Sequence, residues 1–316
     1  MTASVGVDVG GTKCLGVVVD GTGHVLDELR RPTPHSAEAL LEAVADVAAA
    51  LADRHGGPVA GVGVGAPGLV DGDGVLRFAP NLPGITDLPM AAPLAARLGL
   101  PVVVDNDATC AGWGEREVGA GAGHGDVVLV TLGTGIGGGL VLGDRLHRGR
   151  HGFAGEIGHM VVDPHGPPCP CGQRGCWERF ASGSGLGRLA REAAHAGRAG
   201  RILELAGGDP EGVRGEHVTQ AAAEGDEAAL RVMADFAWWV GLGLANLANI
   251  LDPEMFVVGG GLVEAGEVLL EPVREAFAGL VEGAAHRPPV AIVGARLGEH
   301  AGAIGAALLA GARAGD

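Results

Sequence analysis

A pattern of strand, glycine-rich turn and strand occurs twice in this chain, and it constrains the fold more than any other feature. The first copy covers residues 5–25 and the second covers residues 127–148. In both, an apolar run leads into a turn that contains Gly and Thr, and a second apolar run, a short turn and a third strand follow. Because a repeated plan of this kind indicates an internal duplication, we expect two related α/β halves whose glycine turns point at a shared cleft.

The rest of the chain alternates apolar runs of strand length with segments of helical spacing. Helices are predicted over 36–54, 183–196, 227–251 and 262–280, and short strands at 59–64, 102–104, 255–258 and 290–293. No low-complexity linker divides the sequence. We therefore predict an α/β fold with a small first domain at residues 1–112, a larger second domain at 113–299, and a terminal helix at 300–316 that packs back on the first domain.

The composition excludes several classes of function. The formal charge of −16 argues against a nucleic-acid partner, because phosphate backbones need basic surfaces. No apolar leader segment follows the first residue. The longest uncharged runs, at 127–143 and 236–251, fall short of the ~20 residues that a membrane span needs. We expect a soluble cytoplasmic protein with neither a nucleic-acid nor a membrane partner.

Three of the five cysteines lie close together, and a histidine precedes them. They are Cys169, Cys171 and Cys176, with His159 ten positions ahead of the first. Thiolates and imidazole at close range are the ligands that Zn²⁺ selects, and four of them complete a tetrahedral structural site. The alternatives are ordinary buried thiols, which do not normally cluster among Pro and Gly, or a disulfide, which the odd count disfavours. The spacing therefore predicts a zinc knuckle. Its few apolar residues cannot supply enough folding energy, and the metal provides the remainder.

Polar side chains flank this knuckle. Glu156 and His159 precede it, and Glu178 ends it. A sugar presents hydroxyls that donate to such carboxylates, and a site that pairs those hydroxyls rejects analogues without them. The alternative is that both glutamates are solvated surface charges. We interpret the knuckle as the scaffold of a polar binding site.

Three glycine-rich turns, at 8–13, 133–139 and 259–261, offer backbone N–H groups to an anion. Glycine lets the main chain come close to phosphate oxygens. The second turn contains G-x-G-x-x-G, but a predicted strand follows it, and a dinucleotide site needs a helix there. The third joins a strand to a helix, whose dipole favours a nucleotide phosphate. Each turn taken alone is also consistent with an ordinary tight turn.

Two charged residues stand at the first of these turns. Asp8 ends the first strand, where a carboxylate is suited to hold Mg²⁺ through water beside bound phosphates, although an Asx turn is the simpler role. Lys13 is the only lysine in a chain that otherwise uses arginine. Unless codon bias accounts for it, this residue indicates a local need for an ammonium group.

Asn106 and Asp107 follow a buried strand and open a helix. Asp107 is either the cap of that helix or a general base aimed into the cleft. Phosphoryl transfer accepts a weak base, because its transition state is loose and positioning matters more than base strength. We therefore consider Asp107 the candidate catalytic residue.

Five motifs together resemble one family over essentially the whole chain. They are DVGGTK at 8–13, DNDA at 105–108, GTGIGGG at 133–139, EIGH at 156–159 and CPCGQRGCWE at 169–178, the last being highly specific. The chain resembles the ROK family (repressors, open reading frames, kinases), most closely its bacterial and in particular actinobacterial glucokinases. The resemblance implies the actin-like ATPase fold, which is ribonuclease H-like, with duplicated domains and an interdomain cleft.

The resemblance also implies roles for individual residues. Asp107 would deprotonate the sugar 6-hydroxyl, and the sugar would be held by Asn106, Asp107, Glu156, His159 and Glu178. Zinc would be bound by His159, Cys169, Cys171 and Cys176. ATP phosphates would be cradled by Gly10, Gly11, Thr12, Lys13, Gly133, Thr134 and Gly135, with Mg²⁺ supported by Asp8. The nucleoside would lie near Gly259, Gly260 and Gly261. Asn81 and the 65–68 loop are also similar to the family.

The activity that the resemblance implies is ATP-dependent phosphorylation of glucose to glucose 6-phosphate, as part of glycolysis. Other sugars stay open, namely fructose, mannose, N-acetylmannosamine and N-acetylglucosamine, and so does polyphosphate as donor. A sugar-responsive repressor of the same family is the alternative from another class. It would need a helix-turn-helix segment ahead of a first strand that starts near residue 4. The family suggests a homodimer or homotetramer.

Overall fold

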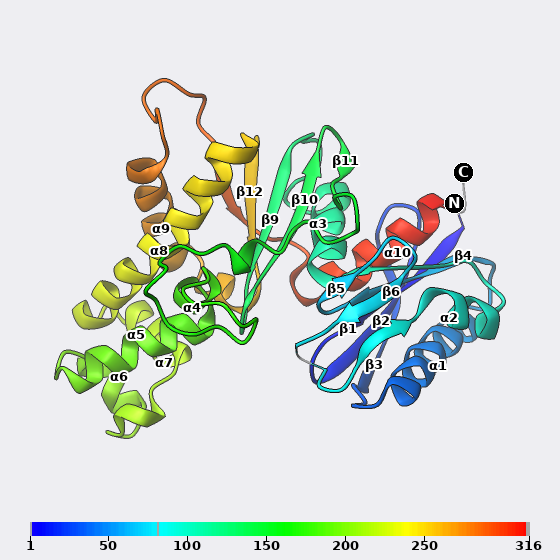
Figure 1. The fold of residues 1–316 in the computed structure, drawn as a ribbon, viewed down its shortest axis with the longest axis horizontal. Coiled ribbons are helices and arrows are strands. Elements are labelled where there is room, and N and C mark those ends of the chain that lie inside the picture. The colour runs from blue at the N-terminus through cyan, green and yellow to red at the C-terminus, as the bar shows by residue number, and fades with distance from the viewer. Residues whose placement is uncertain (1, 81, 314–316) are drawn as a thin grey trace. The chain divides into compact units, whose positions relative to one another are not determined.

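The computed structural model describes residues 2–80 and 82–313, so Asn81 lies outside the described residues. Contacts divide the chain into two compact units (Figure 1). The first unit contains residues up to Leu129, Gly138–Gly155 and those from Ala295 onward, and the second contains Val130–Gly137 and Glu156–Gly294. By these contacts, residues 113–129 and 138–155 belong with the first unit, whereas the sequence prediction assigned them to the second domain.

Two five-stranded sheets share one strand order. The first is ordered β3-β2-β1-β4-β8 and the second β11-β10-β9-β12-β13. The strands of the first are β1 (Ala3–Val9), β2 (Lys13–Val19), β3 (Val25–Pro32), β4 (Val59–Ala66) and β8 (Val102–Asn106). Those of the second are β9 (Val127–Leu132), β10 (Ile136–Leu142), β11 (Arg145–Leu146), β12 (Met255–Gly259) and β13 (Ala291–Gly294). Because each sheet begins with three consecutive strands and adds two later ones on the same side, the predicted duplication is confirmed.

In the first unit, helices cover both faces of the sheet (Figure 1). On β1, side chains alternate between the faces, as the strand period requires. The odd-numbered residues Val5 and Val7 are fully buried in one core with Leu40 and Val44 of α1 (Ala37–His55). On the other face, Leu15 and Val17 of β2 pack in a second core with α10 (Ala301–Arg313).

Glycines allow α10 to lie directly on the sheet and on α3 (Asp107–Val118). A Cβ atom on Gly63 of β4 would come within 1.8 Å of the carbonyl oxygen of Ala306. One on Gly305 of α10 would come within 1.7 Å of the carbonyl oxygen of Cys110 in α3. No real side chain tolerates such distances, so the backbones touch because the side chains are absent. α10 thus fixes α3 against the end of the sheet.

A buried carboxylate secures the far end of α3. Glu115 is fully buried and accepts hydrogen bonds from the backbone N–H groups of Ala120, Arg296 and Leu297, at 2.8, 2.9 and 2.7 Å. Charge-assisted bonds to backbone donors are among the stronger ones in proteins. They join α3 to the segment that leads into α10.

The remaining elements of the first unit are small. β5 (Leu69–Val70), β6 (Val75–Phe78) and β7 (Thr86–Pro89) form an antiparallel three-stranded sheet, and α2 (Ala91–Leu98) follows. The sequence does not predict the short strands β5 and β7. Two and four residues are too few to give a period-2 signal.

The second unit is rich in helices. Its α-helices are α4 (Glu178–Ala181), α5 (Gly183–His195), α6 (Gly200–Leu205), α7 (Gly215–Ala223), α8 (Glu227–Leu251) and α9 (Glu267–Leu280). Short 3-10 turns occur at Ile157–His159, Pro210–Gly212 and Gly261–Ala265, and one at Gly298–His300 in the first unit. Among the described helices, α8 alone is long and apolar enough to cross a membrane, but 61% of its most apolar window is buried within the structure. Buried core helices of globular proteins meet the same criterion.

We predict that Gly305→Ala lowers the free energy of unfolding by more than about 2 kcal/mol, because the new methyl group overpacks the contact with Cys110. Gly279→Ala is the matched control. It makes the same change in a helix, but its Cβ would meet nothing within 4 Å, so stability should hold or rise by up to about 1 kcal/mol. Urea unfolding of both variants checks this, and equal effects would contradict the packing account.

Candidate functional site

The junction of β8 and α3 carries Asn106 and Asp107. Asn106 is the N-cap of α3, since its Oδ1 accepts from the Thr109 N–H at 2.9 Å. The alternative that Asp107 caps the helix is therefore wrong: Asp107 is the first helical residue, and its Oδ1 accepts from the next N–H, that of Ala108, at 2.8 Å. Asn106 also donates from Nδ2 to the Gly68 carbonyl at 3.1 Å. Its amide keeps a second N–H and a second oxygen lone pair for a ligand.

Asp8 lies in the same part of the first unit. A Cβ on Gly65 would be 3.3 Å from both Asp8 Oδ1 and the Asp107 Cα. Asp8 Oδ1 is buried and, among the described residues, has no hydrogen-bond partner. Burial, and secondarily the charge of Asp107, raise the pKa of Asp8 to about 7, while Lys13 acts in the opposite direction. A buried carboxylate oxygen without a donor is suited to a cation or a cation-bound water.

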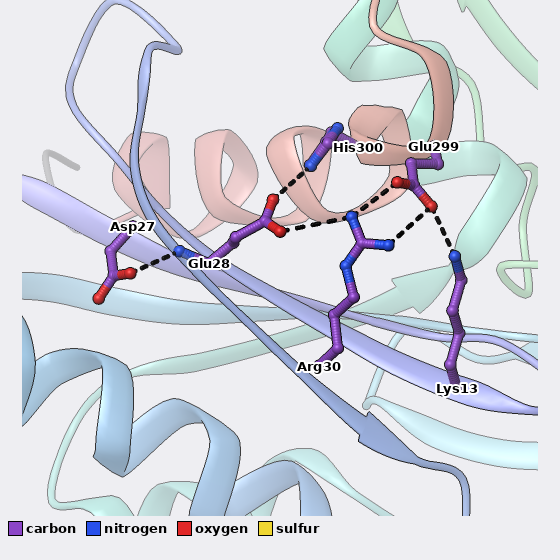
Figure 2. A network of polar contacts seen from close by, with 6 residues as sticks. All are labelled: Lys13, Asp27, Glu28, Arg30, Glu299 and His300. Carbon is purple, nitrogen blue, oxygen red and sulfur yellow. Dashed lines mark hydrogen bonds and ion pairs between the residues drawn. The ribbon is translucent and has the colours of Figure 1, made fainter.

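Lys13 takes part in a surface network of charged side chains (Figure 2). Its Nζ lies 2.5 Å from Glu299, whose other oxygen accepts from Arg30 at 2.7 Å. Arg30 also faces Glu28, which contacts His300. The hydrogen bond from Lys13, and secondly that from Arg30, lower the pKa of Glu299 to about 2. The side chains are about half exposed, so the pair contributes little stability; its effect is to fix where the ammonium group rests.

In the second unit, the four predicted metal ligands converge. His159, Cys169, Cys171 and Cys176 each offer one atom, and all four atoms lie within 4.8 Å of one another. Cys171 and Cys176 are 3.6 Å apart through their sulfurs, and Cys169 Sγ is 3.7 Å from His159 Nδ1. The edge of a tetrahedron around zinc, with bonds of ~2.3 Å to sulfur, is about 3.8 Å. Donor set and spacing therefore fit a tetrahedral zinc ion.

The two glutamates lie on either side of His159. Glu178 Oε1 is 3.9 Å from Nδ1, and Glu156 Oε2 is 3.9 Å from Nε2. Glu178 also accepts from the Cys169 thiol at 3.0 Å. Its side chain is only 16% exposed, so it is not a freely solvated surface charge. Burial, and then the charge of Glu178, raise the pKa of Glu156, while His159 acts against them.

A buried tryptophan anchors the knuckle to the core of the second unit. Trp177 is fully buried, and its indole N–H donates to the Trp239 carbonyl of α8 at 2.7 Å. Its ring lies where a Cβ on Gly243 would be, 1.9 Å from the nearest ring atom. Phe180 stacks on the Trp239 ring at 4.1 Å. Glu178 therefore follows a residue that is held by close packing and by a hydrogen bond.

The second glycine turn touches this site directly. A Cβ on Gly135 would be 2.7 Å from Glu178 Oε2, so the carboxylate can lie there only because residue 135 is glycine. On the other side, the Gly133 carbonyl accepts from the Gly183 N–H at 2.8 Å, and the Thr134 carbonyl accepts from Ser184 Oγ at 3.0 Å. This turn therefore joins Glu178 to the beginning of α5.

A cavity of about 990 Å³ opens beside that turn within the second unit. Of the predicted nucleotide residues, Gly133, Thr134 and Gly261 line it. The other polar lining residues were not predicted from the sequence; they are Ser184, Arg191, Arg214, Glu216, Thr219, Gln220 and Glu264. The one available signal was the G-S-G run at the start of α5, whose N-terminus offers N–H groups and a positive dipole to an anion.

The third glycine turn differs from the prediction. The sequence predicted one helix over 262–280, but the structure has a 3-10 turn at Gly261–Ala265 and a separate α9 from Glu267. Gly266 has a φ of +58°, which ends the turn and starts the helix in a new direction. The dipole of α9 therefore does not begin at Gly261. Gly260, with φ +82°, packs against the Leu132 backbone.

Comparison with known proteins identifies the family. The model of the ROK family matches residues 4–313. The chain belongs to the ROK family. The glucokinase of Streptomyces coelicolor is 43% identical over 313 residues, covering 98% of each chain. That of Thermotoga maritima is 36% identical over 322 residues, again covering 98% of each.

A solved structure extends the likeness to three dimensions. It is a ROK family glucokinase from Streptomyces griseus in complex with glucose and AMPPNP. It superposes with a TM-score of 0.85 at 43% identity, over 97% of this chain and 98% of that one. The predicted α/β fold class is confirmed: the mixed sheets and their helices are those of ROK kinases, within the actin-like ATPases.

We predict a pH-dependent stability that comes from Asp8. In the folded state the raised pKa keeps the Asp8 carboxyl protonated up to about pH 7, whereas in the unfolded chain it ionises near its ordinary value of 3.8. The free energy of unfolding therefore falls as the pH rises from the unfolded pKa through the folded pKa of about 7. Relative to Asp8→Asn, the metal-free wild type should lose on the order of 4 kcal/mol between about pH 4 and pH 8.

Urea unfolding across this pH range tests the expectation, with exposed Asp235→Asn as the control that should follow the wild type. A difference between wild type and Asp8→Asn that does not change with pH would contradict it.

Proposed function

We propose that this chain is an ATP-dependent glucokinase that phosphorylates the 6-hydroxyl of glucose. The observation that carries the proposal is the near full-length likeness to a ROK glucokinase solved with glucose and AMPPNP. The described geometry supports it independently. Asp107 stands at a fixed helix start, Glu156 and Glu178 lie on either side of His159 in the cluster of candidate metal ligands, and a cavity of about 990 Å³ adjoins a glycine turn.

In the proposed reaction, Asp107 accepts the proton of the sugar 6-hydroxyl as that oxygen attacks the γ-phosphorus of ATP. The bond from the γ-phosphorus to the bridging oxygen breaks, and ADP leaves with the electron pair. The backbone N–H of Ala108 holds one oxygen of Asp107, which fixes the direction of the other. Since the transition state is loose, this orientation contributes more than the strength of the base.

We assign the remaining sugar hydroxyls to Asn106, Glu156, His159 and Glu178. Asn106 keeps one donor and one acceptor position, and the glutamates accept. His159 faces Cys169 with Nδ1 and Glu156 with Nε2. Metal binding through Nδ1 would leave Nε2–H as a donor to the sugar, so one ring would serve both partners.

For the donor, we propose that the cavity beside Gly133 and Thr134 takes the nucleotide and that Lys13 and the turn at Gly10–Lys13 bind phosphate oxygens. Gly259, Gly260 and Gly261 would lie near the nucleoside. Mg²⁺ would be supported by Asp8, whose buried oxygen has no donor among the described residues. When bound, it would neutralise charge on the transferring phosphoryl group.

We propose structural zinc at His159, Cys169, Cys171 and Cys176, where it would set the orientation of His159 and Glu178 and stabilise the knuckle. All five cysteines are free thiols, as a thiolate site requires, and this supports a reducing cytoplasmic location. A homodimer or homotetramer remains our proposal for the assembly.

We propose glucose as the substrate rather than fructose, mannose, N-acetylmannosamine or N-acetylglucosamine. We likewise propose ATP rather than polyphosphate as the phosphoryl donor. The repressor alternative is disfavoured by the charge of −16, which opposes binding to DNA. Ranking kcat/KM over a panel of these sugars and donors, with gel-shift measurements on DNA, separates the options.

We predict that Asp107→Ala lowers kcat for glucose about 10²–10⁴-fold, as expected for loss of a general base, with a change in glucose affinity of less than about tenfold. The control is Asp235→Ala, an exposed aspartate on α8. Steady-state assays with Mg-ATP and calorimetry with glucose measure the two effects. Turnover near that of the wild type would remove Asp107 from the reaction.

A further inference from the structure

We propose that Arg148 is a positioning residue for the candidate base, acting through an ion pair with the buried Asp105 carboxylate. The inference rests on the proposed function, because it assigns a role relative to Asp107. Its structural part, that Arg148 orders the β8–α3 junction, is testable without any activity.

The first observation is the ion pair itself. Arg148 Nε lies 2.6 Å from Asp105 Oδ2, across 43 positions of sequence. The Asp105 side chain is 6% exposed and that of Arg148 is 37% exposed. Arg148 thus reaches from the segment after β11 to a carboxylate that is almost out of contact with water. Taking one member out of such a pair leaves the other charge buried and uncompensated.

The second observation is what the other oxygen of Asp105 does. Oδ1 accepts from the backbone N–H of Asn106 at 2.9 Å. One carboxylate therefore connects the guanidinium group of Arg148 to the Asp105–Asn106 peptide, one residue ahead of Asp107. The orientation of this peptide sets the direction in which β8 passes into α3.

The third observation is that the bonds at this junction are consecutive. Asp105 binds the N–H of Asn106, Asn106 binds that of Thr109, and Asp107 binds that of Ala108. Each of these side chains accepts a hydrogen bond from a backbone N–H close by in the sequence. A shift of the Asp105 side chain would therefore also move the backbone of Asn106 and Asp107. Arg148 supplies an opposing charge to this run through its ion pair with Asp105.

Without Arg148, the buried Asp105 carboxylate would have no guanidinium partner and would turn toward water. This turn weakens its hydrogen bond to the Asn106 N–H, so the first turn of α3 would become more mobile. A displacement of about 1 Å in a reacting group can cost on the order of 10²-fold in rate. The donor nucleotide does not contact Arg148 in the proposed arrangement, so its KM should change little.

The test uses Arg148→Gln, Arg148→Lys and the control Arg150→Gln. Arg150 lies two positions along in the same segment, is exposed, and makes no ion pair within the described part of the chain. We expect Arg148→Gln to lower kcat about 10- to 100-fold, with KM for ATP within about threefold of the wild type. Arg148→Lys should restore part of kcat, since it returns the charge but not the planar Nε donor.

A double variant isolates the pair. Asp105→Asn with Arg148→Gln removes both charges and leaves no buried charge uncompensated, so its kcat should exceed that of Arg148→Gln alone. If Arg148 only stabilised the fold, urea midpoints would fall while kcat of the folded enzyme stayed at the value of Arg150→Gln. That result would overturn the proposal.

Hydrogen exchange gives the readout that does not need activity. In Arg148→Gln, the amides of Asn106 and Thr109 should exchange at least about tenfold faster than in the wild type, while those of α10 stay protected. Unchanged exchange at both amides would overturn the positioning role even if the protein phosphorylated no sugar. Faster exchange in Arg148→Gln, together with a wild-type protein that phosphorylates no sugar, would instead uphold the positioning role and contradict the proposed function.

Discussion

The contact between the Cys169 thiol and the Glu178 carboxylate, 3.0 Å long, is the interaction on which the rest of the site depends. It joins Cys169, a proposed metal ligand, to Glu178, a proposed sugar ligand. Glu178 also packs closely against Gly135 of a glycine turn. Burial, followed by the hydrogen bond to Glu178, raises the pKa of the Cys169 thiol above its usual range. Two acidic groups at this distance tolerate each other only with a shared proton or a cation beside them. Our account gives that place to zinc.

In the first unit, several contacts fix the position of one aspartate, Asp107. Glycines bring α10 into backbone contact with the sheet and with α3, and Glu115 fixes the far end of that helix. The near end is held by side chains that bind the first backbone donors. Sites built on rigid helices and strands keep their geometry better than sites on loops. Asp107 therefore begins a helix whose two ends and one side are all fixed by other parts of the same unit.

Much of the fold could be predicted because its signals are local. Apolar periodicity located α1, α8 and β10, and the repeated strand–turn–strand plan predicted two related halves, which the strand order shared by both sheets confirms. The cysteine spacing led to four ligands that do converge. No sequence pattern indicates partners that are distant along the chain, such as Glu299 for Lys13 or Arg148 for Asp105. The prediction of one helix over 262–280 was wrong because of a single residue. Gly266 has a left-handed φ, which separates the 3-10 turn before it from α9.

The central claim is that a cysteine-bound zinc ion sets the positions of the groups that hold the sugar. X-ray absorption at the zinc edge, combined with glucose calorimetry on wild type and Cys176→Ser, tests it most directly, with Cys14→Ser as the control thiol. We predict one nitrogen at about 2.0 Å and three sulfurs at about 2.3 Å from zinc in the wild type. Cys176→Ser should lose the metal and bind glucose at least about tenfold more weakly, while Cys14→Ser retains both. Full glucose affinity in a zinc-free protein would contradict the account.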